Sequence, residues 1–197
     1  MNNYELKELF SVKDKIVMVT GAAKGNGKII ADGFVQSGAI VYYVDVLDTV
    51  KTNIEFDQSG RSKAFIIDLT EQDEIFRMIN SIDVIDVLVN NAGVALPVDG
   101  SGNSENWNRT ININLNAVYE LSRSVCELMK KNNGGSIINI TSISSFLGSA
   151  GNPSYHASKG GLKYLTKSMA VDYGSYNIRV NNLCPGYFKT EMTRGSF

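Results

Sequence analysis

Tyr155 and Lys159 are the first residues in this sequence whose types and spacing could do chemistry. If their segment is helical, the two side chains lie one turn apart on the same face. A free tyrosine hydroxyl has a pKa of about 10, and a nearby cation lowers that pKa because it favours the phenolate. A tyrosine tuned in this way can protonate a forming alkoxide or take the proton from an alcohol. Solvated surface pairs share this spacing, so other parts of the chain must decide between the two interpretations.

The composition indicates one folded domain, spanning residues 1–197. Hydrophobic residues make up 43% of the chain and charged residues 20%, which is enough apolar material for a packed core. The formal net charge of −1 argues against a nucleic-acid-binding surface. The sequence has no apolar run near the roughly 20 residues of a membrane span. The polar N-terminus lacks the apolar core of a secretion signal, so we expect a cytoplasmic protein without a membrane partner.

The cysteines and the single histidine point away from metal chemistry. Cys126 and Cys184 lie in apolar surroundings, which is typical of reduced core thiols in a cytosolic protein. With one histidine in the chain, no metal site of the His/Cys kind can be assembled. We interpret that histidine, His156, as a bystander that points away from Tyr155.

The first third of the chain has the pattern strand, glycine-rich turn, helix, strand. Residues 15–20 and 40–44 are apolar, β-branched runs; residues 21–27 form the turn, and a helical pattern ends near Gly38. Glycines allow a close backbone approach, and the start of the following helix offers N–H groups to a phosphate. Asp45, at the end of the second strand, could accept hydrogen bonds from an adenosine ribose. A turn that merely tightens the connection is the alternative, but this context favours a bound dinucleotide.

Strands and helices alternate along the rest of the chain, which predicts an α/β fold with a parallel sheet. We expect strands at 62–67, 84–90, 136–140 and 179–183, a short amphipathic helix around 75–82, and longer helices at 106–132 and 154–173, with a polar loop from Asp99 to Asn106. In such a sheet the ligand lies outside the carboxyl ends of the strands. The chemically suggestive groups all fall at those ends, which supports a common site.

Taken together, these motifs resemble the short-chain dehydrogenase/reductase family from Lys15 to Met192. The matching segments are Thr20-Gly21-x-x-x-Gly25-x-Gly27, Asp68, Asn90-Asn91-Ala92-Gly93, Asn114, Ser142, the Tyr155/Lys159 pair and Pro185-Gly186-x-x-x-Thr190. The resemblance implies a Rossmann-like, doubly wound parallel sheet with the strand order 3-2-1-4-5-6. It also implies an oxidoreductase that interconverts a secondary alcohol and a ketone by hydride transfer to or from NAD(P).

The resemblance assigns four catalytic residues. Tyr155 would be the general acid/base, and Lys159 would lower its pKa and hold the nicotinamide ribose. Ser142 would hydrogen-bond the substrate oxygen, and Asn114 would position a water that links Lys159 to solvent. Simpler interpretations remain: Ser142 could cap a turn, and Asn114 could be an ordinary helical residue.

The resemblance also implies a set of dinucleotide contacts at the glycine-rich turn, the strand ends, the Tyr155 helix and the segment after the sixth strand. The set is Gly21, Ala22, Lys24, Gly25, Asn26, Gly27, Asp45, Asp68, Leu69, Asn91, Gly93, Tyr155, Lys159, Pro185, Gly186, Phe188 and Thr190. Asp45 would repel a 2′-phosphate and favours NAD, whereas Lys24 stands where NADP-preferring members often carry a basic residue. We expect the carboxylate to outweigh the lysine, so the prediction is NAD rather than NADP.

Two departures from the family pattern qualify these expectations. Asn26 replaces the aliphatic residue usual between the last two glycines of the turn. The chain ends at Phe197, before the family's substrate-covering segment and seventh strand. We therefore expect the chain to bind dinucleotide more readily than it turns over, and a non-catalytic member that binds nucleotide or partner subunits is the alternative function.

The family further implies a homodimer or higher oligomer, paired through the helices that carry Asn114 and Tyr155. Candidate residues for that contact are Met129, Tyr164, Leu165 and Met169, although core packing would explain them equally well. The hydroxyl or carbonyl substrate is not identified by the sequence. Its determinants would lie in the segments 94–103 and 146–152.

Overall fold

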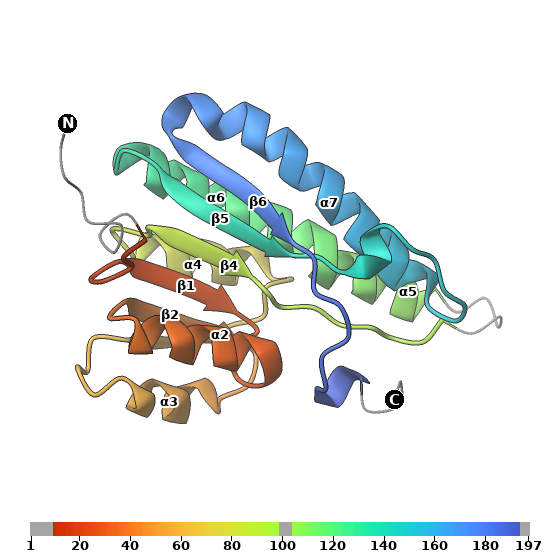
Figure 1. Cartoon of the computed structure of the whole chain (residues 1–197), viewed down its shortest axis with the longest axis horizontal. Coiled ribbons are helices and arrows are strands. Elements are labelled where there is room, and N and C mark those ends of the chain that lie inside the picture. Colours follow the sequence, from red (N-terminus) through yellow and green to blue (C-terminus); the bar gives the residue numbers. More distant parts are fainter. Residues whose placement is uncertain (1–9, 99–103, 194–197) are drawn as a thin grey trace.

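The chain forms a six-stranded, fully parallel sheet, described here from a computed structural model of residues 10–98 and 104–193 (Figure 1). The strand order β3-β2-β1-β4-β5-β6 confirms the predicted order. The strands are β1 (Ile16–Thr20), β2 (Ile40–Asp45), β3 (Lys63–Ile66), β4 (Val87–Asn90), β5 (Gly135–Ile140) and β6 (Ile178–Leu183). Every pair of neighbouring strands is parallel, so all carboxyl ends meet at one edge.

Helices pack against both faces of the sheet. On one face lie α2 (Gly25–Gln36) and the short α3 (Val50–Asn53), which the sequence did not predict. The other face is covered by α4 (Gln72–Asn80), α6 (Ala117–Lys131) and α7 (Pro153–Tyr173), with α5 (Glu105–Ile111) packed on α7. Among the described helices, none has both the length and the apolar character needed to cross a membrane.

The two layers explain why the strands read as continuous apolar runs. Along β1, Met18 faces the cluster under α4 and α6, whereas Val17 and Val19 face the cluster under α2. All three side chains are fully buried. Both faces of a central parallel strand are covered, so alternation between apolar and polar residues is absent. Polar side chains are left to the strand ends, which is where the predicted site lies.

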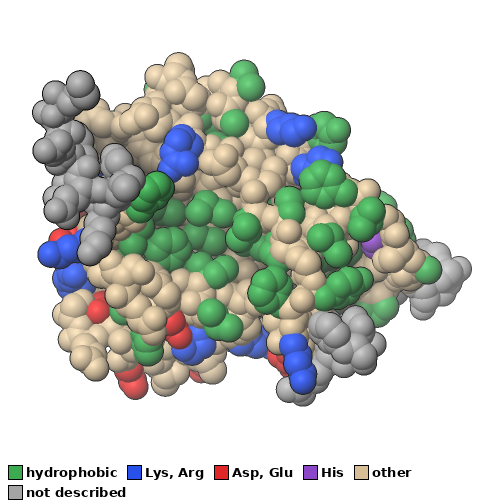
Figure 2. Space-filling model, in the orientation of Figure 1, with side chains coloured by type: hydrophobic (Ala, Val, Ile, Leu, Met, Phe, Trp, Pro, Cys, Tyr) green, Lys and Arg blue, Asp and Glu red, His purple; other side chains and the backbone are tan. Residues whose placement is uncertain are grey.

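The α2 layer covers only the β1–β3 half of its face. Figure 2 shows apolar side chains gathered beside it, over the front of β4 and β5. Val87 and Ile138 are partly buried there, and Leu183 of β6 is 52% exposed. Within the described residues, no helix lies over this part of the sheet.

The predicted helix over 106–132 is not continuous. A π-helical turn, Asn112–Asn116, separates α5 from α6. Inside it, Asn114 is fully buried, and its amide donates to the Val94 carbonyl and accepts from the Val94 N–H, both at 2.8 Å. These bonds are made to a distant loop, so helical periodicity could not reveal them. Such π turns are frequent at functional sites.

Other boundaries differ by a few residues. β4 starts at Val87 instead of residue 84. Just before it, the Asp86 carboxylate accepts from the Ile16 N–H and pairs with Lys15. The predicted loop from Asp99 to Asn106 falls partly outside the described residues, and α5 already begins at Glu105.

The predicted dimer face is wrong for two of its four residues. Met129 is 0% and Met169 is 2% exposed, and both belong to the core. Leu165 is partly buried against the same core. Only Tyr164, which is 65% exposed, points outward as a contact residue would.

A buried polar network joins three strands to two helices. Asn90 of β4 donates to Ser122 Oγ on α6 and to Asn139 Oδ1 on β5, both at 2.8 Å. Asn139 in turn donates to Thr166 Oγ1 on α7, and Thr166 contacts Asn182 on β6. Buried polar groups are tolerated only when they are hydrogen-bonded, so these residues fix the relative positions of the elements they join.

Replacing Asn139 tests this network. We expect Asn139→Ala to lower the free energy of unfolding by about 1–3 kcal/mol, because it leaves buried partners on Asn90 and Thr166 unsatisfied. Urea unfolding followed by circular dichroism measures the change. The matched control is Asn181→Ala, an exposed residue on the neighbouring strand, which should stay within about 0.5 kcal/mol of the unchanged chain. Equal effects of the two substitutions would contradict a stabilising network.

Candidate active site

The glycine-rich turn, residues 21–27, leaves no room for side chains at two positions. Gly21 has a φ of 65°, and a Cβ added there would lie 2.9 Å from Ala92 Cα. A Cβ added at Gly27 would lie 2.0 Å from the Gly21 carbonyl oxygen. The turn therefore folds back on itself directly before α2, whose N-terminus has no side-chain cap and is the kind of helix start that binds phosphate.

Three side chains from other elements hold the turn in place. Asp45 accepts from the Ala23 N–H at 3.0 Å, and Asn91 donates to the Thr20 carbonyl at 3.0 Å and to that of Gly21 at 3.3 Å. Asn53 of α3 donates to the carbonyls of both Ala22 and Ala23, each at 3.0 Å. Asn53 carried no sequence signal, because it belongs to a short helix and its partners lie some 30 positions away.

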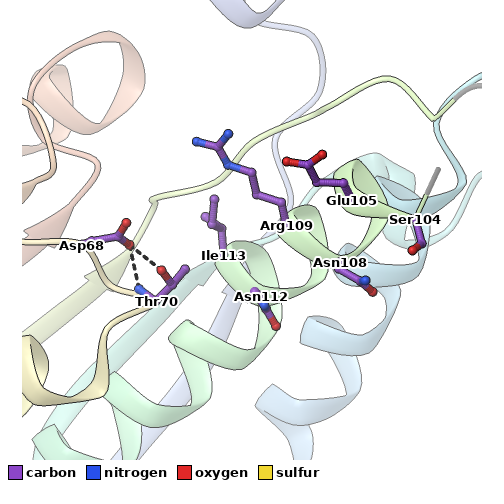
Figure 3. Close-up of a pocket in the computed structure, with 8 residues that line it drawn as sticks. All are labelled: Asp68, Thr70, Ser104, Glu105, Asn108, Arg109, Asn112 and Ile113. Atoms are coloured by element: carbon purple, nitrogen blue, oxygen red, sulfur yellow. Dashed lines mark hydrogen bonds between the residues drawn. The ribbon is translucent and has the colours of Figure 1, made fainter.

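A pocket of about 560 Å³ opens at the β3 end of the same edge (Figure 3). Asp68 and Thr70 form one side, and Arg109 and Ile113 of the α5 and π-turn segment form the other. Asp68 Oδ1 accepts from the N–H and the hydroxyl of Thr70, at 2.9 and 2.7 Å. Leu69 packs against the core beside it. The pocket thus offers a carboxylate and an apolar side chain at the place predicted for adenine.

Tyr155 and Ser142 meet at the opposite part of the edge. Ser142 follows β5 and Tyr155 lies in the first turn of α7, yet the Ser142 hydroxyl is close enough to the phenol to oppose the rise in the pKa of Tyr155. Ser142 Oγ also accepts from the Ser144 N–H at 3.1 Å, so the simpler interpretation as a turn cap holds as well. A phenol and a hydroxyl that lie this close can both hydrogen-bond one substrate oxygen.

Lys159 is buried beside this pair. It is 4% exposed, and its ammonium donates to the Ile140 carbonyl at 2.8 Å and lies 5.7 Å from the centroid of the Tyr155 ring. A Cβ added at Gly93 would come within 3.5 Å of Lys159 Nζ and 3.2 Å of Asn114 Oδ1, so glycine keeps this space open. Burial lowers the pKa of Lys159 to about 8, since removing the ammonium from water disfavours its charge.

The pKa of Tyr155 does not follow the prediction from the Tyr–Lys spacing. Burial raises the pKa of Tyr155 above its usual value, and the hydrogen bond with Ser142 opposes this rise only in part. The lowering expected from Lys159 is not found, because its ammonium bonds the Ile140 carbonyl and not the phenol oxygen. In this structure burial is therefore the main influence on the phenol.

Asn114 connects the π turn to the same helix. Its amide donates to Ser158 Oγ at 3.1 Å, and Ser158 donates to the Tyr155 carbonyl at 2.8 Å. Asn114 is therefore more than an ordinary helical residue, since its side chain fixes the loop at Val94 and the start of α7 together.

The segment after β6 returns to the glycine-rich turn. The Ile143 N–H donates to the Pro185 carbonyl at 3.1 Å, which ties this segment to the strand end at Ser142. Further along, Lys24 forms an ion pair with Glu191 at 2.6 Å across the edge. Of the predicted contacts here, Gly186 and Phe188 are exposed, and the Thr190 N–H donates to Thr193 Oγ1.

His156 is not the bystander that the sequence indicated. Its ring lies edge-on to that of Tyr155, with 6.4 Å between centroids, and both of its nitrogens are hydrogen-bonded. The described residues contain no group of three or more His, Cys, Asp and Glu side chains that could hold a metal ion.

Comparisons with known proteins agree with this geometry. The family described as short chain dehydrogenase matches residues 15–197. Cyclopentanol dehydrogenase from a Comamonas species is 36% identical over 192 residues, which cover 93% of this chain and 76% of that protein.

Two solved structures have the same fold. Gluconate 5-dehydrogenase from Burkholderia cenocepacia, in complex with NADP and tartrate, is 30% identical with a TM-score of 0.88. A 7α-hydroxysteroid dehydrogenase complexed with NADH and 7-oxo glycochenodeoxycholic acid is 31% identical with a TM-score of 0.89. In both cases 94% of this chain and 76% of the other are covered. The chain belongs to the short-chain dehydrogenase/reductase family and is an NAD(P)-dependent oxidoreductase.

Proposed function

We propose that the chain uses NAD to interconvert a secondary alcohol and a ketone, with Tyr155 as the general acid/base. The observation that carries this proposal is that Tyr155 lies close to Ser142 and to the buried Lys159 ammonium, which is 5.7 Å from the centroid of the Tyr155 ring. The described residues fit a dinucleotide, because the cradle at Gly21 and Gly27 has no room for any side chain and ends at a helix N-terminus.

The residues have separate roles in this proposal. Nicotinamide supplies hydride chemistry when it is bound. Tyr155 donates a proton to the substrate oxygen during reduction and takes it back during oxidation, while Ser142 donates a hydrogen bond to the same oxygen. Lys159, held on the Ile140 carbonyl, would bind the nicotinamide ribose, and Asn114 fixes the start of α7 through Ser158. The proton passes between phenol and substrate within one hydrogen bond.

Two charged residues, Asp45 and Lys24, bear on the choice between NAD and NADP. The Asp45 carboxylate stands at the end of β2, and a 2′-phosphate placed there would meet a like charge. Lys24, the residue that could compensate, is paired with Glu191 at 2.6 Å. Because both members of this pair are exposed, the pair is weak, and the carboxylate is the stronger argument.

The relatives' names support small alcohols and ketones as the substrate class. Cyclopentanol and gluconate both carry a secondary hydroxyl that is oxidised to a ketone, and they make a first test panel. The exposed Phe146 and Leu147, next to the site, favour substrates with an apolar part.

The first test replaces the acid/base. We expect Tyr155→Phe to lower kcat by roughly 10²–10⁴-fold, because no group remains to exchange the proton. NADH binding, followed by fluorescence titration, should weaken far less than kcat falls, because the glycine-rich turn and Asp45 are unchanged. Tyr164→Phe, an exposed tyrosine on the same helix, is the control and should keep full activity. Absorbance at 340 nm with the test panel measures turnover. Full activity of Tyr155→Phe would contradict the assignment of Tyr155 as the general acid/base.

The second test uses the burial of Lys159. Its pKa is about 8 in the folded chain, against about 10.4 when unfolded. Between these values the unfolded state binds more protons, so this residue makes stability rise with pH. We expect the free energy of unfolding of the unchanged chain to increase relative to Lys159→Met between about pH 7 and about pH 10. A difference between the two proteins that is the same at both pH values would show that Lys159 is not buried as a cation.

The third test concerns cofactor choice. Asp45→Asn keeps an oxygen that can accept from the Ala23 N–H but removes the charge. We expect the affinity for NADP to rise about tenfold relative to NAD, a change of about 1.4 kcal/mol. Isothermal titration with both dinucleotides measures the ratio. Asp172→Asn, an exposed carboxylate on α7, should leave the ratio unchanged. No shift with Asp45→Asn would overturn the preference argued here.

A further inference from the structure

The segment 143–152 joins two residues of the proposed site, Ser142 before it and Tyr155 after it. Phe146 is 65% and Leu147 64% exposed, so the segment presents apolar side chains at the surface. A shift of the segment would move these side chains relative to Tyr155. The contacts that fix the 143–152 segment therefore affect how a substrate is bound.

The first part of the segment is fixed to the middle of α7. Ser145 Oγ donates to the Lys159 carbonyl at 3.0 Å. The Phe146 ring lies under the ammonium of Lys163, which is 3.8 Å from the ring centroid. Neither contact reaches the tip of the segment, residues 148–151.

The tip is held by His156. The Ser149 N–H donates to His156 Nε2 at 3.1 Å, and the Ser149 hydroxyl lies 3.2 Å from the same nitrogen. On the other side of the ring, His156 Nδ1 is 2.7 Å from the Asn152 carbonyl oxygen. One imidazole thus joins the tip of the segment to its end, at the first turn of α7.

These partners allow only one form of the ring. A carbonyl oxygen can only accept, so Nδ1 must carry the proton. A backbone N–H can only donate, so Nε2 must keep its lone pair. The ring is therefore the neutral Nδ1–H tautomer, set by its two hydrogen bonds.

We infer that His156 is a positioning residue: it clips the tip of the 143–152 segment, part of the stretch expected to carry substrate determinants, to the first turn of α7. Both nitrogens are engaged in the clip, so the ring acts through the segment and not on the substrate. Only the expected effect of the clip on substrate binding rests on the proposed function. The hydrogen bonds of the clip can be tested without measuring turnover.

The chain has a single histidine, so the imidazole nitrogen signals in a long-range ¹H–¹⁵N NMR spectrum are assigned without ambiguity. We expect the spectrum of the whole chain to show a protonated Nδ1 and an unprotonated Nε2. A protonated Nε2 in the neutral ring would overturn the clip. This result is independent of whether the chain turns over any substrate, so a failure of the proposed function would be distinguished from a failure of the clip.

Substitutions test the effect on the segment. In His156→Gln the side-chain carbonyl can reach the Nε2 position and accept from Ser149, whereas in His156→Asn it cannot. We expect His156→Asn to speed amide exchange at Ser149 and to raise KM about tenfold, as for one lost hydrogen bond, with kcat unchanged. His156→Gln should restore both quantities toward those of the unchanged chain.

Ser149→Ala is the matched control. It removes the hydroxyl contact but keeps the backbone N–H that makes the bond, so Nε2 should stay unprotonated and KM should rise less than in His156→Asn. Equal behaviour of His156→Asn and His156→Gln, or a loss of kcat without a change in KM, would overturn the positioning role.

Discussion

The arrangement at the sheet edge depends on one buried cation. The Lys159 ammonium is withdrawn from solvent, pairs with the Ile140 carbonyl and lies against the Tyr155 ring. Burying a charge is costly unless it is hydrogen-bonded, so the surrounding elements must keep their positions closely. Gly93 leaves the space for the ammonium, and the Asn114 bonds to Val94 hold the strand-four loop next to it.

The burial of the sheet on both faces explains why the side chains of the proposed site lie at one edge. The central strands are apolar on both faces along most of their length, so the polar side chains of the proposed site lie at strand ends, in the π turn and in the first two turns of α7. Parallel pairing brings those ends together. The buried network around Asn139 then fixes β4, β5 and β6 relative to α6 and α7, which keeps Ser142 and Tyr155 in register. The side chains at the sheet edge are therefore positioned by hydrogen bonds that are buried in the core.

Most of the fold followed from local patterns in the sequence. Apolar runs placed the strands, glycines marked the turn, and the alternation of strand and helix predicted a parallel sheet. What could not be predicted depends on contacts between distant residues. The π turn at 112–116 arises from bonds between Asn114 and a loop 20 positions away, while the helical periodicity runs through it without a break.

The site shows the same division. Ser142 and Tyr155 meet as predicted, but the Tyr–Lys spacing predicted a lowered pKa for the phenol, and burial instead raises it. Spacing reports the neighbours of a side chain, whereas burial is a property of the whole fold. His156 was misread for a related reason: its partners, Ser149 and Asn152, lie in an irregular segment with no periodic signal. Asn53 was missed because nothing near it in sequence indicates the turn that it holds.

The most direct measurement is an NMR titration of the Lys159 side chain, assigned by comparison with Lys159→Met. The account predicts that Lys159 titrates at about 8 in the folded chain, because its ammonium is buried at the catalytic edge. Titration at the ordinary lysine value of about 10.4 would place the ammonium in water and contradict the account.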